Sequence, residues 1–164
     1  MSTIGHPSSL SQTSRHDFQR EPFVAGFASV KGGVRFVLIT VHTAPERART
    51  EIPALAHSLA WARNRFPGQD GFIILGDFNA SGSYASEANL NQWRTKELPY
   101  KWIVPDDADT NVSPNSKRAY DRIVVTDGMA TRFTERWDVD DSFTDEGVSD
   151  HWPVWAEFQL SPSR

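Results

Sequence analysis

The stretch that most constrains the fold is an apolar run, Phe72-Ile73-Ile74-Leu75, followed by Gly76-Asp77-Phe78-Asn79-Ala80. Four apolar residues are too few for a helix, so the run predicts a buried strand that Gly76 ends. Side chains alternate along a strand, and Asp77 and Asn79 are therefore expected to point the same way. A carboxylate suits Mg²⁺ and an amide suits phosphate or water, so this strand end predicts a metal-and-phosphate site. A plain turn is the alternative, because Gly, Asp and Asn are common in turns.

The remaining sequence predicts strands that alternate with helices in one mixed α/β domain, residues 20–160. Helical periodicity predicts a first helix that starts at Thr50 or at Thr43 and ends near Phe66, and a second that runs from Ser86 to about Leu98. Strands are expected at 23–29, 34–42, 72–75, 102–104, 123–125, 132–139 and 152–158. Residues 1–19 are expected to form a flexible leader, and 161–164 a tail.

Composition restricts the chemistry that this chain can perform. The absence of cysteine excludes disulfides, thiolate nucleophiles and zinc held by sulfur, which favours a hard metal ion. A net charge of -4 argues against a broad basic face for nucleic acid but allows a local groove beside a metal. No apolar run is long enough for a membrane span, and the polar start lacks the apolar core of a signal peptide. We therefore expect a soluble protein whose location the sequence does not specify.

Polar residues follow several of the predicted strands: His42, Asp77 with Asn79, Tyr120-Asp121-Arg122, and Ser149-Asp150-His151. Strand ends of an α/β sheet gather along one edge, so these segments are expected to share a cleft. Their local sequences, GDFNA, AYDRIVV and SDHWPV, resemble the endonuclease/exonuclease/phosphatase superfamily, and its deoxyribonuclease I-like branch in particular.

The resemblance extends over residues 20–158 and includes VHTAP, GDFNASGSY, WIVPDDADT, AYDRIVV and SDHWPVWAEF in the order of the family. It implies a four-layered α/β sandwich of the deoxyribonuclease I type. It also implies a metal-dependent site for phosphodiester hydrolysis at one end of the two sheets, with DNA as the substrate.

The resemblance assigns catalytic and metal-binding roles to particular residues. His151 resembles the general base that takes a proton from the attacking water, with Asp121 orienting its imidazole. Asp77 and Asp150 resemble carboxylates associated with Mg²⁺ or Mn²⁺, and Asn79 resembles the amide that positions the phosphate and the transition state.

Four further residues resemble secondary site residues of the family. His42 matches a second histidine, which stabilises the phosphate or protonates the leaving group. Tyr120 resembles a residue at the phosphate, and Arg20 a contact to the DNA backbone; packing or a solvated cation explains either equally well. Asp109, with the loop 111–115, resembles a structural Ca²⁺ loop, although loops of this composition are common without an ion.

The chain also departs from the family pattern. The resemblance covers only the carboxyl-terminal half of the family domain, so the glutamate that is its principal metal ligand is expected on a missing segment or a second chain. Gly82 and Arg118 stand where deoxyribonuclease I carries a cysteine pair.

Three functions are therefore compatible with the sequence. The first is a Mg²⁺-dependent endonuclease whose site is completed by another segment or chain. The second is a phosphoesterase of the same superfamily with another substrate, such as a phosphoinositide or a sphingolipid. The third is a noncatalytic fragment or interaction module.

Overall fold

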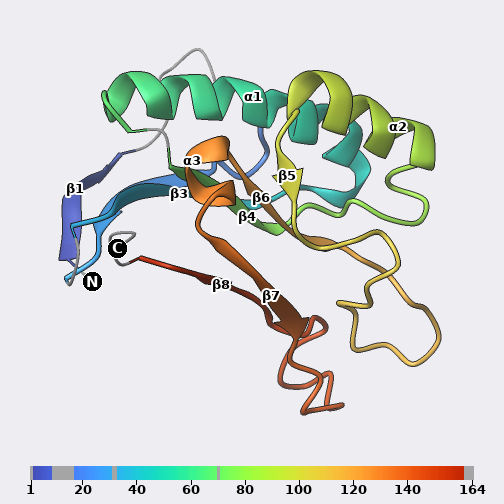
Figure 1. Cartoon of the computed structure of the whole chain (residues 1–164). Helices are drawn as coiled ribbons and strands as arrows, with labels where there is room; N and C mark the ends of the chain where they lie inside the picture. The colour runs from blue at the N-terminus through green and yellow to red at the C-terminus, as the bar shows by residue number, and fades with distance from the viewer. Residues whose placement is uncertain (1, 9–16, 31–32, 70, 161–164) are drawn as a thin grey trace.

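The structure is a computed structural model that describes residues 2–8, 17–30, 33–69 and 71–160 (Figure 1). The helices are α1 (Ala48–Arg65), α2 (Glu87–Gln92) and the short α3 (Asp127–Ala130), and a 3₁₀ turn, Pro45–Arg47, precedes α1 while a π turn, Trp93–Glu97, extends α2. The strands are β1 (Ser2–Ser8), β2 (Phe23–Ala28), β3 (Arg35–His42), β4 (Phe72–Asp77), β5 (Lys101–Trp102), β6 (Asp121–Val125), β7 (Phe133–Val139) and β8 (Val154–Phe158).

These elements form two sheets and a helical layer. The larger sheet has the strand order β1-β2-β3-β4-β6-β5, and β7 pairs with β8 in the smaller one. In Figure 1, α1 and α2 lie on one face of the larger sheet, and β7 and β8 lie on the side opposite these helices. The mixed α/β sandwich expected from the sequence is confirmed, with three layers among the described residues.

The sheet register places three strand ends at one edge. β3 and β4 are parallel, as expected for strands joined by the helix α1, so both end at the same edge with His42 opposite Asp77. β6 is antiparallel to β4 and therefore starts where β4 ends, with Asp121 opposite Asp77. Strand direction alone thus gathers polar residues that are far apart in sequence.

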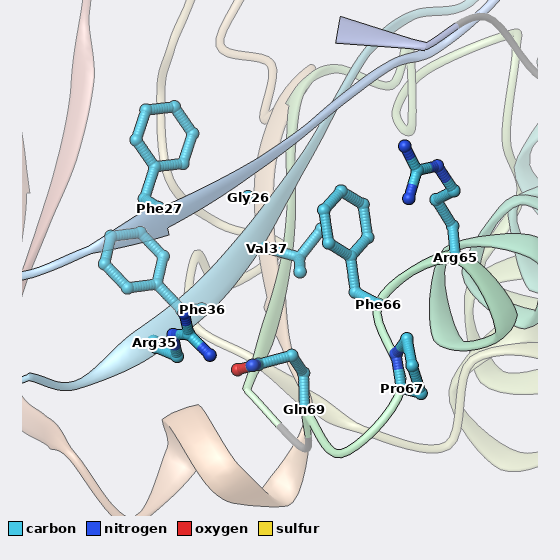
Figure 2. A pocket seen from close by; sticks show the side chains of 9 residues that line it. All are labelled: Gly26, Phe27, Arg35, Phe36, Val37, Arg65, Phe66, Pro67 and Gln69. Atoms are coloured by element: carbon cyan, nitrogen blue, oxygen red, sulfur yellow. The ribbon is translucent and has the colours of Figure 1, made fainter. Parts of the chain in front are cut away.

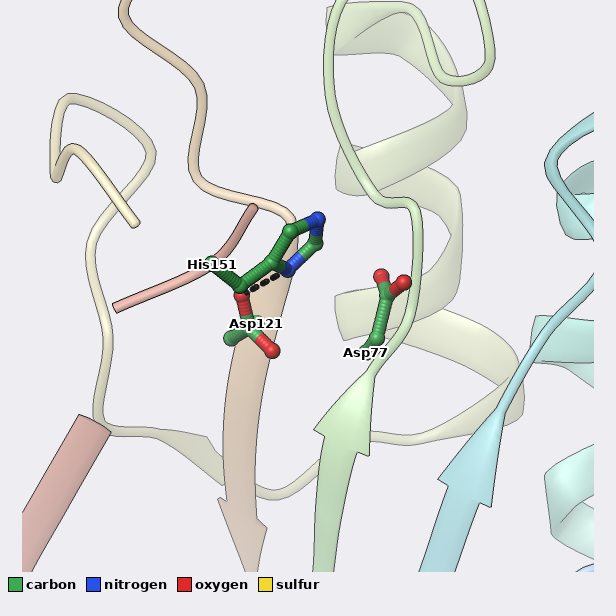
Figure 3. A group of neighbouring side chains, drawn as sticks. All are labelled: Asp77, Asp121 and His151. Atoms are coloured by element: carbon green, nitrogen blue, oxygen red, sulfur yellow. Dashed lines mark hydrogen bonds and ion pairs between the residues drawn. The ribbon is translucent and has the colours of Figure 1, made fainter. Parts of the chain in front are cut away.

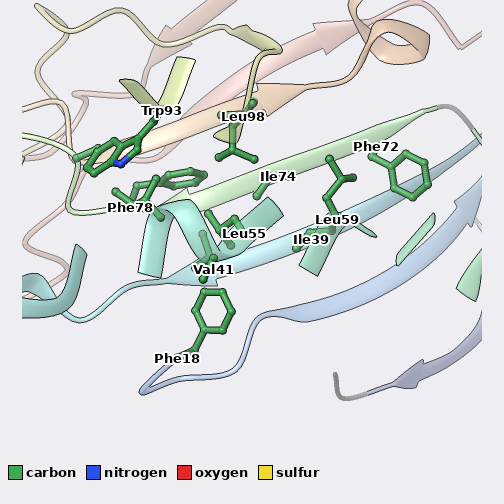
Figure 4. Close-up of a cluster of buried hydrophobic side chains, with 14 of the residues drawn as sticks. Phe18, Ile39, Val41, Leu55, Leu59, Phe72, Ile74, Phe78, Trp93 and Leu98 are labelled. Atoms are coloured by element: carbon green, nitrogen blue, oxygen red, sulfur yellow. The ribbon is translucent and has the colours of Figure 1, made fainter. Parts of the chain in front are cut away.

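The main core lies between the helices and the larger sheet (Figure 4). α1 contributes the apolar stripe that the sequence predicts, with Ile52, Leu55, Leu59 and Ala62 all buried. The sheet contributes Val37, Ile39, Val41, Phe72 and Ile74, and the chain beyond β4 adds Phe78, Trp93 and Leu98.

A second apolar cluster covers the other face of the sheet. It contains Phe36, Ile73 and Ile123 from the larger sheet, Met129 from α3 and Phe133, the first residue of β7. β3 and β4 are therefore apolar on both faces, because both faces are covered. A cavity of about 460 Å³ remains between this face and β8.

The start of α1 differs from both predicted starts. The helix begins at Ala48, and Arg47 occupies the N-cap position without a side-chain cap. Thr50 lies within the first turn and donates a hydrogen bond to the carbonyl of Arg47, whereas Thr43 donates to the carbonyl of Phe78. The preceding 3₁₀ turn sets the start of the helix, so neither threonine is needed as a cap. By contrast, Ser86 caps α2, as predicted, and the structure adds a capping box in which the side chain of Asn89 accepts from the backbone of Ser86.

The expected leader, residues 1–19, contains described structure at both ends. Ser2–Ser8 forms β1, which pairs with β2, and the side chain of Phe18 is buried in the main core. Residues 9–16, and the tail 161–164, lie outside the described residues. The part of the chain that the structure describes holds no helix long and apolar enough to cross a membrane.

A shallow pocket of about 230 Å³ opens near the start of β3 (Figure 2). It lies between β2, β3 and the carboxyl-terminal end of α1, and its lining includes Phe27, Phe36 and Phe66 together with Arg35 and Arg65. Since Arg35 begins β3 and His42 ends it, this pocket lies at the end of the strand opposite to the gathered polar residues.

Candidate active site

A histidine and an aspartate from distant segments form the centre of the site. His151 lies just before β8, and its Nδ1 is 2.7 Å from Oδ2 of Asp121, the first residue of β6 (Figure 3). The hydrogen bond to this carboxylate raises the pKa of His151, against the opposing effect of burial. The ring of Tyr120 stacks on the imidazole, with the ring centroids 5.5 Å apart. The imidazole is therefore held by both its nitrogen and its face.

Asp77 ends β4 and faces this pair. Burial raises the pKa of Asp77, and the neighbouring charge of Asp121 raises it further, while the amide of Asn79 acts in the opposite direction. His42, at the end of β3, places Nε2 3.3 Å from Oδ2 of Asp77 and remains largely exposed. The carboxylates of Asp77 and Asp121 thus face each other on the adjacent strands β4 and β6. Asp77 has His42 beside it, and Asp121 has His151.

Asn79 lies beside Asp77 for a reason other than the predicted one. β4 ends at Asp77, and Asn79 adopts a left-handed conformation with φ of 48°. Its amide N–H donates to Oδ1 of Asp77 at 2.8 Å, and its Nδ2 donates to Oδ2 of Asp77 and to the carbonyl of Thr43. The two side chains do lie together, but a turn and not strand alternation brings them there, so the predicted reason was wrong.

Asp77, Asp121 and His151 could hold a metal ion. One ligand atom from each residue lies within 4.8 Å of those of the other two. The facing carboxylates fit a divalent cation, because a positive charge between them would offset both the burial of the Asp77 charge and its repulsion by Asp121, the two effects that raise the pKa of Asp77. Asp121 was predicted as the partner of His151 and not as a ligand, so this group differs from the predicted metal pair.

Asp150, the other predicted metal ligand, lies outside this group of three. Its side chain is exposed, and its negative charge contributes to the raised pKa of His151. The carbonyl of Asp150 accepts a hydrogen bond from the amide of Val112. The metal-binding role of Asp150 stays a prediction.

The remaining predicted residues occupy supporting positions. Arg20 donates from Nε and Nη2 to the carbonyls of His42 and Thr43, which braces the end of β3. Oδ1 of Asp109 accepts the backbone N–H groups of Asn111 and Arg118, so part of its capacity serves the loop itself. The DNA contact of Arg20 and the Ca²⁺ site at Asp109 stay predictions.

Other neighbours of the site were not singled out from the sequence. Tyr84 lies beside Tyr120 with the ring centroids 6.0 Å apart, and the Oγ1 of Thr110 accepts backbone amides at the start of β6. The loops that carry Gly82 and Arg118 still meet without cysteines, since a Cβ on Gly82 would lie 2.9 Å from Nε of Arg118. Only the tertiary structure reveals these contacts, because each joins segments that no local pattern relates.

Comparison with known proteins gives a consistent family. The model of the endonuclease/exonuclease/phosphatase family matches residues 7–151. The chain is 35% identical over 159 residues to human deoxyribonuclease gamma, which covers 90% of this chain and 51% of the relative. It is 35% identical over 149 residues to deoxyribonuclease-1 of Sus scrofa, covering 84% of this chain and 52% of the relative. The chain therefore spans about half the length of the curated relatives it matches.

Solved structures share the fold at lower sequence identity. The 3' phosphatase NExo from Neisseria, bound to a product DNA hairpin, superposes with a TM-score of 0.65 at 20% identity, covering 93% of this chain and 70% of that one. An endonuclease/exonuclease/phosphatase from Bacteroides vulgatus gives a TM-score of 0.58 at 17% identity, covering 87% and 58%.

Proposed function

Because the chain belongs to the endonuclease/exonuclease/phosphatase family, we propose that it takes part in the metal-dependent hydrolysis of phosphodiester bonds in DNA. The observation that carries the proposal is the 2.7 Å hydrogen bond between Asp121 and His151 at the strand edge that also holds Asp77 and Asn79. The names of the related deoxyribonucleases support DNA as the substrate.

His151 would act as the general base. In the neutral imidazole Nδ1–H donates a hydrogen bond to Oδ2 of Asp121, which leaves Nε2 with a lone pair that can take a proton from water. Stacking on Tyr120 restricts rotation of the ring, so that Nε2 keeps one direction. The raised pKa makes the basic form available only as the pH rises above that pKa.

A divalent cation fits beside the base. Asp77 and Asp121 would hold it, with Mg²⁺ or Mn²⁺ as the expected ion. When bound, such an ion polarises the phosphate and offsets the negative charge that develops in the transition state. Mg²⁺ prefers an octahedral set of ligands, so the described residues leave positions for water, for substrate and for ligands from another segment or a second chain.

Asn79 and His42 would hold the phosphate. Nδ2 of Asn79 already contacts Asp77, so small rotations of the amide would direct a donor to a phosphate oxygen bound beside that carboxylate. His42 has a largely exposed side chain on the other side of Asp77, where it can donate to a phosphate or to the leaving oxygen.

Nicking of supercoiled plasmid DNA tests this function. The purified chain is incubated with Mg²⁺ or Mn²⁺, and His151→Ala is compared with His57→Ala, which removes an exposed histidine of α1 that pairs with Asp17. We expect His151→Ala to lower the rate by about 100-fold or more, as for loss of a general base, and His57→Ala to leave it unchanged.

Two results would contradict the proposal. Equal nicking by the His151→Ala variant would exclude His151 as the general base. The absence of metal-dependent nicking by the unmodified chain would exclude a DNA nuclease that acts without a further segment or chain. A panel of other phosphate esters, run on the same samples, separates a different substrate from a noncatalytic module.

A further inference from the structure

Thr110 lies at the junction between the two segments that carry the Asp121–His151 pair. Its side chain is completely buried, and its Oγ1 accepts hydrogen bonds from the backbone N–H groups of Tyr120, at 3.1 Å, and Asp121, at 3.2 Å. The same hydroxyl donates to the carbonyl of Arg118 at 3.2 Å. Donor and acceptor capacity of this hydroxyl are therefore both used by the chain that enters β6.

The backbone of Thr110 holds the other segment. Its carbonyl accepts the N–H of Trp152 at 3.0 Å, and the next residue, Asn111, forms a β-bridge with His151. The N–H of Val112 completes this short antiparallel contact by donating to the carbonyl of Asp150. One residue thus touches the backbone of Asp121 through its side chain and the neighbour of His151 through its carbonyl.

The hydroxyl of Thr110 accepts two successive backbone N–H groups, which a partner strand in a regular sheet could not do. Successive N–H groups of an extended strand point to opposite sides, so one oxygen accepts two of them only where the backbone departs from extended geometry. β5 pairs with β6 only near Val124 and Val125, and Thr110 supplies the partner at the other end of β6. Without that oxygen, two part-buried N–H groups would lose their acceptor, and the start of β6 would have to move for them to find another.

We propose that Thr110 is a positioning residue that sets the distance and direction between the Asp121 carboxylate and the His151 imidazole. The inference rests on the proposed function only in that the Asp121–His151 pair is taken to be catalytic. The arrangement itself is tested by spectroscopy that needs no turnover.

The test compares three variants by NMR of the ¹⁵N-labelled chain. Thr110→Val keeps the shape and removes the hydroxyl, Thr110→Ser restores it, and Thr126→Val is the matched control. Thr126 is also buried, directly follows β6, and accepts the N–H of Phe72 through Oγ1 at 2.9 Å, at the end of β6 opposite to the site. The readouts are the imidazole Nδ1–H signal of His151 and the hydrogen exchange of the Tyr120 and Asp121 amides.

The expected result separates the three variants. In Thr110→Val the imidazole signal is lost or exchanges rapidly, and the two amides exchange about tenfold faster or more, as for loss of a buried hydrogen-bond acceptor. Thr110→Ser retains the signal. Thr126→Val also retains it, even where its own Phe72 amide exchanges faster.

Three results would overturn the inference. These are an unchanged imidazole signal in Thr110→Val, an equal loss of the signal in Thr126→Val, and rapid exchange of the Tyr120 and Asp121 amides in the unmodified chain. The last measurement decides even if Thr110→Val does not fold. A chain that keeps the signal but fails to nick DNA would count against the proposed nuclease and not against the role of Thr110.

Discussion

At the residue scale, the site depends on charges that are unfavourable alone and favourable together. Asp77 ends β4 and faces Asp121 at the start of β6, and burial, together with the charge of Asp121, raises the pKa of Asp77. His151 is stabilised in its charged form by Asp121, so its pKa is raised as well. A cation between the carboxylates would offset their mutual repulsion. A neutral imidazole beside that cation is the form that could take a proton from water in the proposed hydrolysis.

The Asp121–His151 pair predicts a pH-dependent stability. The folded-state pKa of His151 is raised above its usual value of 6.5, so the pair stabilises the fold fully below that value. The contribution is lost as the pH rises through the raised pKa. At high pH, Asp121 instead leaves Asp77 with an unfavourable like charge.

We therefore expect Asp121→Asn to lower the melting temperature more at about pH 5.5 than at about pH 9. Thermal melts of both proteins without metal measure the difference. A larger penalty at the higher pH would show that this ion pair does not stabilise the fold. His57→Ala, which alters only an exposed pair, serves as the control at both pH values.

Asn79 combines a special backbone conformation with a functional amide, and two substitutions separate these properties. Asn79→Ala loses the side-chain hydrogen bonds and keeps a β-carbon in the left-handed region, which costs roughly 1–2 kcal/mol. Asn79→Gly loses the same bonds but accepts this φ without strain. We expect both variants to lose nicking activity and Asn79→Ala to be the less stable in urea unfolding. Equal stability of the two would remove the conformational argument.

At the element scale, the close approach of β3 and β4 positions the site. The two strands pair in parallel from Val37 and Phe72 up to His42 and Asp77. Gly76, one residue before Asp77, has a φ of 132°, and a Cβ at this position would lie 2.1 Å from the carbonyl oxygen of Val41. Only glycine therefore lets β4 deliver Asp77 beside the end of β3.

Gly76→Ala is accordingly expected to destabilise the protein by about 3 kcal/mol or more, since the clash is with backbone and the conformation is strained. Gly68→Ala is the matched control, because Gly68 also has a positive φ, of 76°, but has open space where its Cβ would lie. Denaturant unfolding of both variants provides the measurement. A similar loss at the two positions would mean that φ alone, and not the contact with β3, makes Gly76 necessary.

At the scale of the whole molecule, a buried cation joins loops that surround the site. Arg122 is almost completely buried next to Asp121, and its guanidinium donates to the carbonyl oxygens of Val104, Pro105 and Ala80. Burial lowers the pKa of Arg122 to about 10, which leaves it charged at neutral pH, and Oδ1 of Asp106 lies 3.0 Å from Nη2. The loop after β4 and the loop after β5 are thereby tied to β6.

Arg122→Met should cost about 2–4 kcal/mol, because two buried carbonyls and one part-buried carbonyl lose their donor and the ion pair of this buried guanidinium with the exposed Asp106 is broken. Arg136→Met provides the contrast, since its pair with Glu157 is exposed and worth at most about 1 kcal/mol. Chemical denaturation of both variants checks the difference. If Arg122→Met unfolds like the unmodified protein, the loops do not depend on this cation.

The sequence by itself determined most of the elements and the candidate residues, because hydrophobic periodicity and short motifs are local, but it did not predict β1 or α3. The apolar run at 72–75, the stripe on α1 and the cap at Ser86 appear as predicted, but the strand continues through Gly76 to Asp77 and does not end at Gly76. The predicted start of α1 and the predicted reason for the proximity of Asn79 and Asp77 were wrong. A 3₁₀ turn precedes α1 and Asn79 adopts a left-handed conformation, and both depend on packing against neighbouring segments.

Only the tertiary structure decided which of the candidates meet. It placed Asp121 with Asp77 and His151, left Asp150 outside that group, and put Thr110 and Arg122 between the segments that carry them. The physical reason is that strand direction and register, and not distance along the chain, fix which side chains share an edge. The run at 72–75 predicts a site, and the pairing of the surrounding strands decides which residues form it.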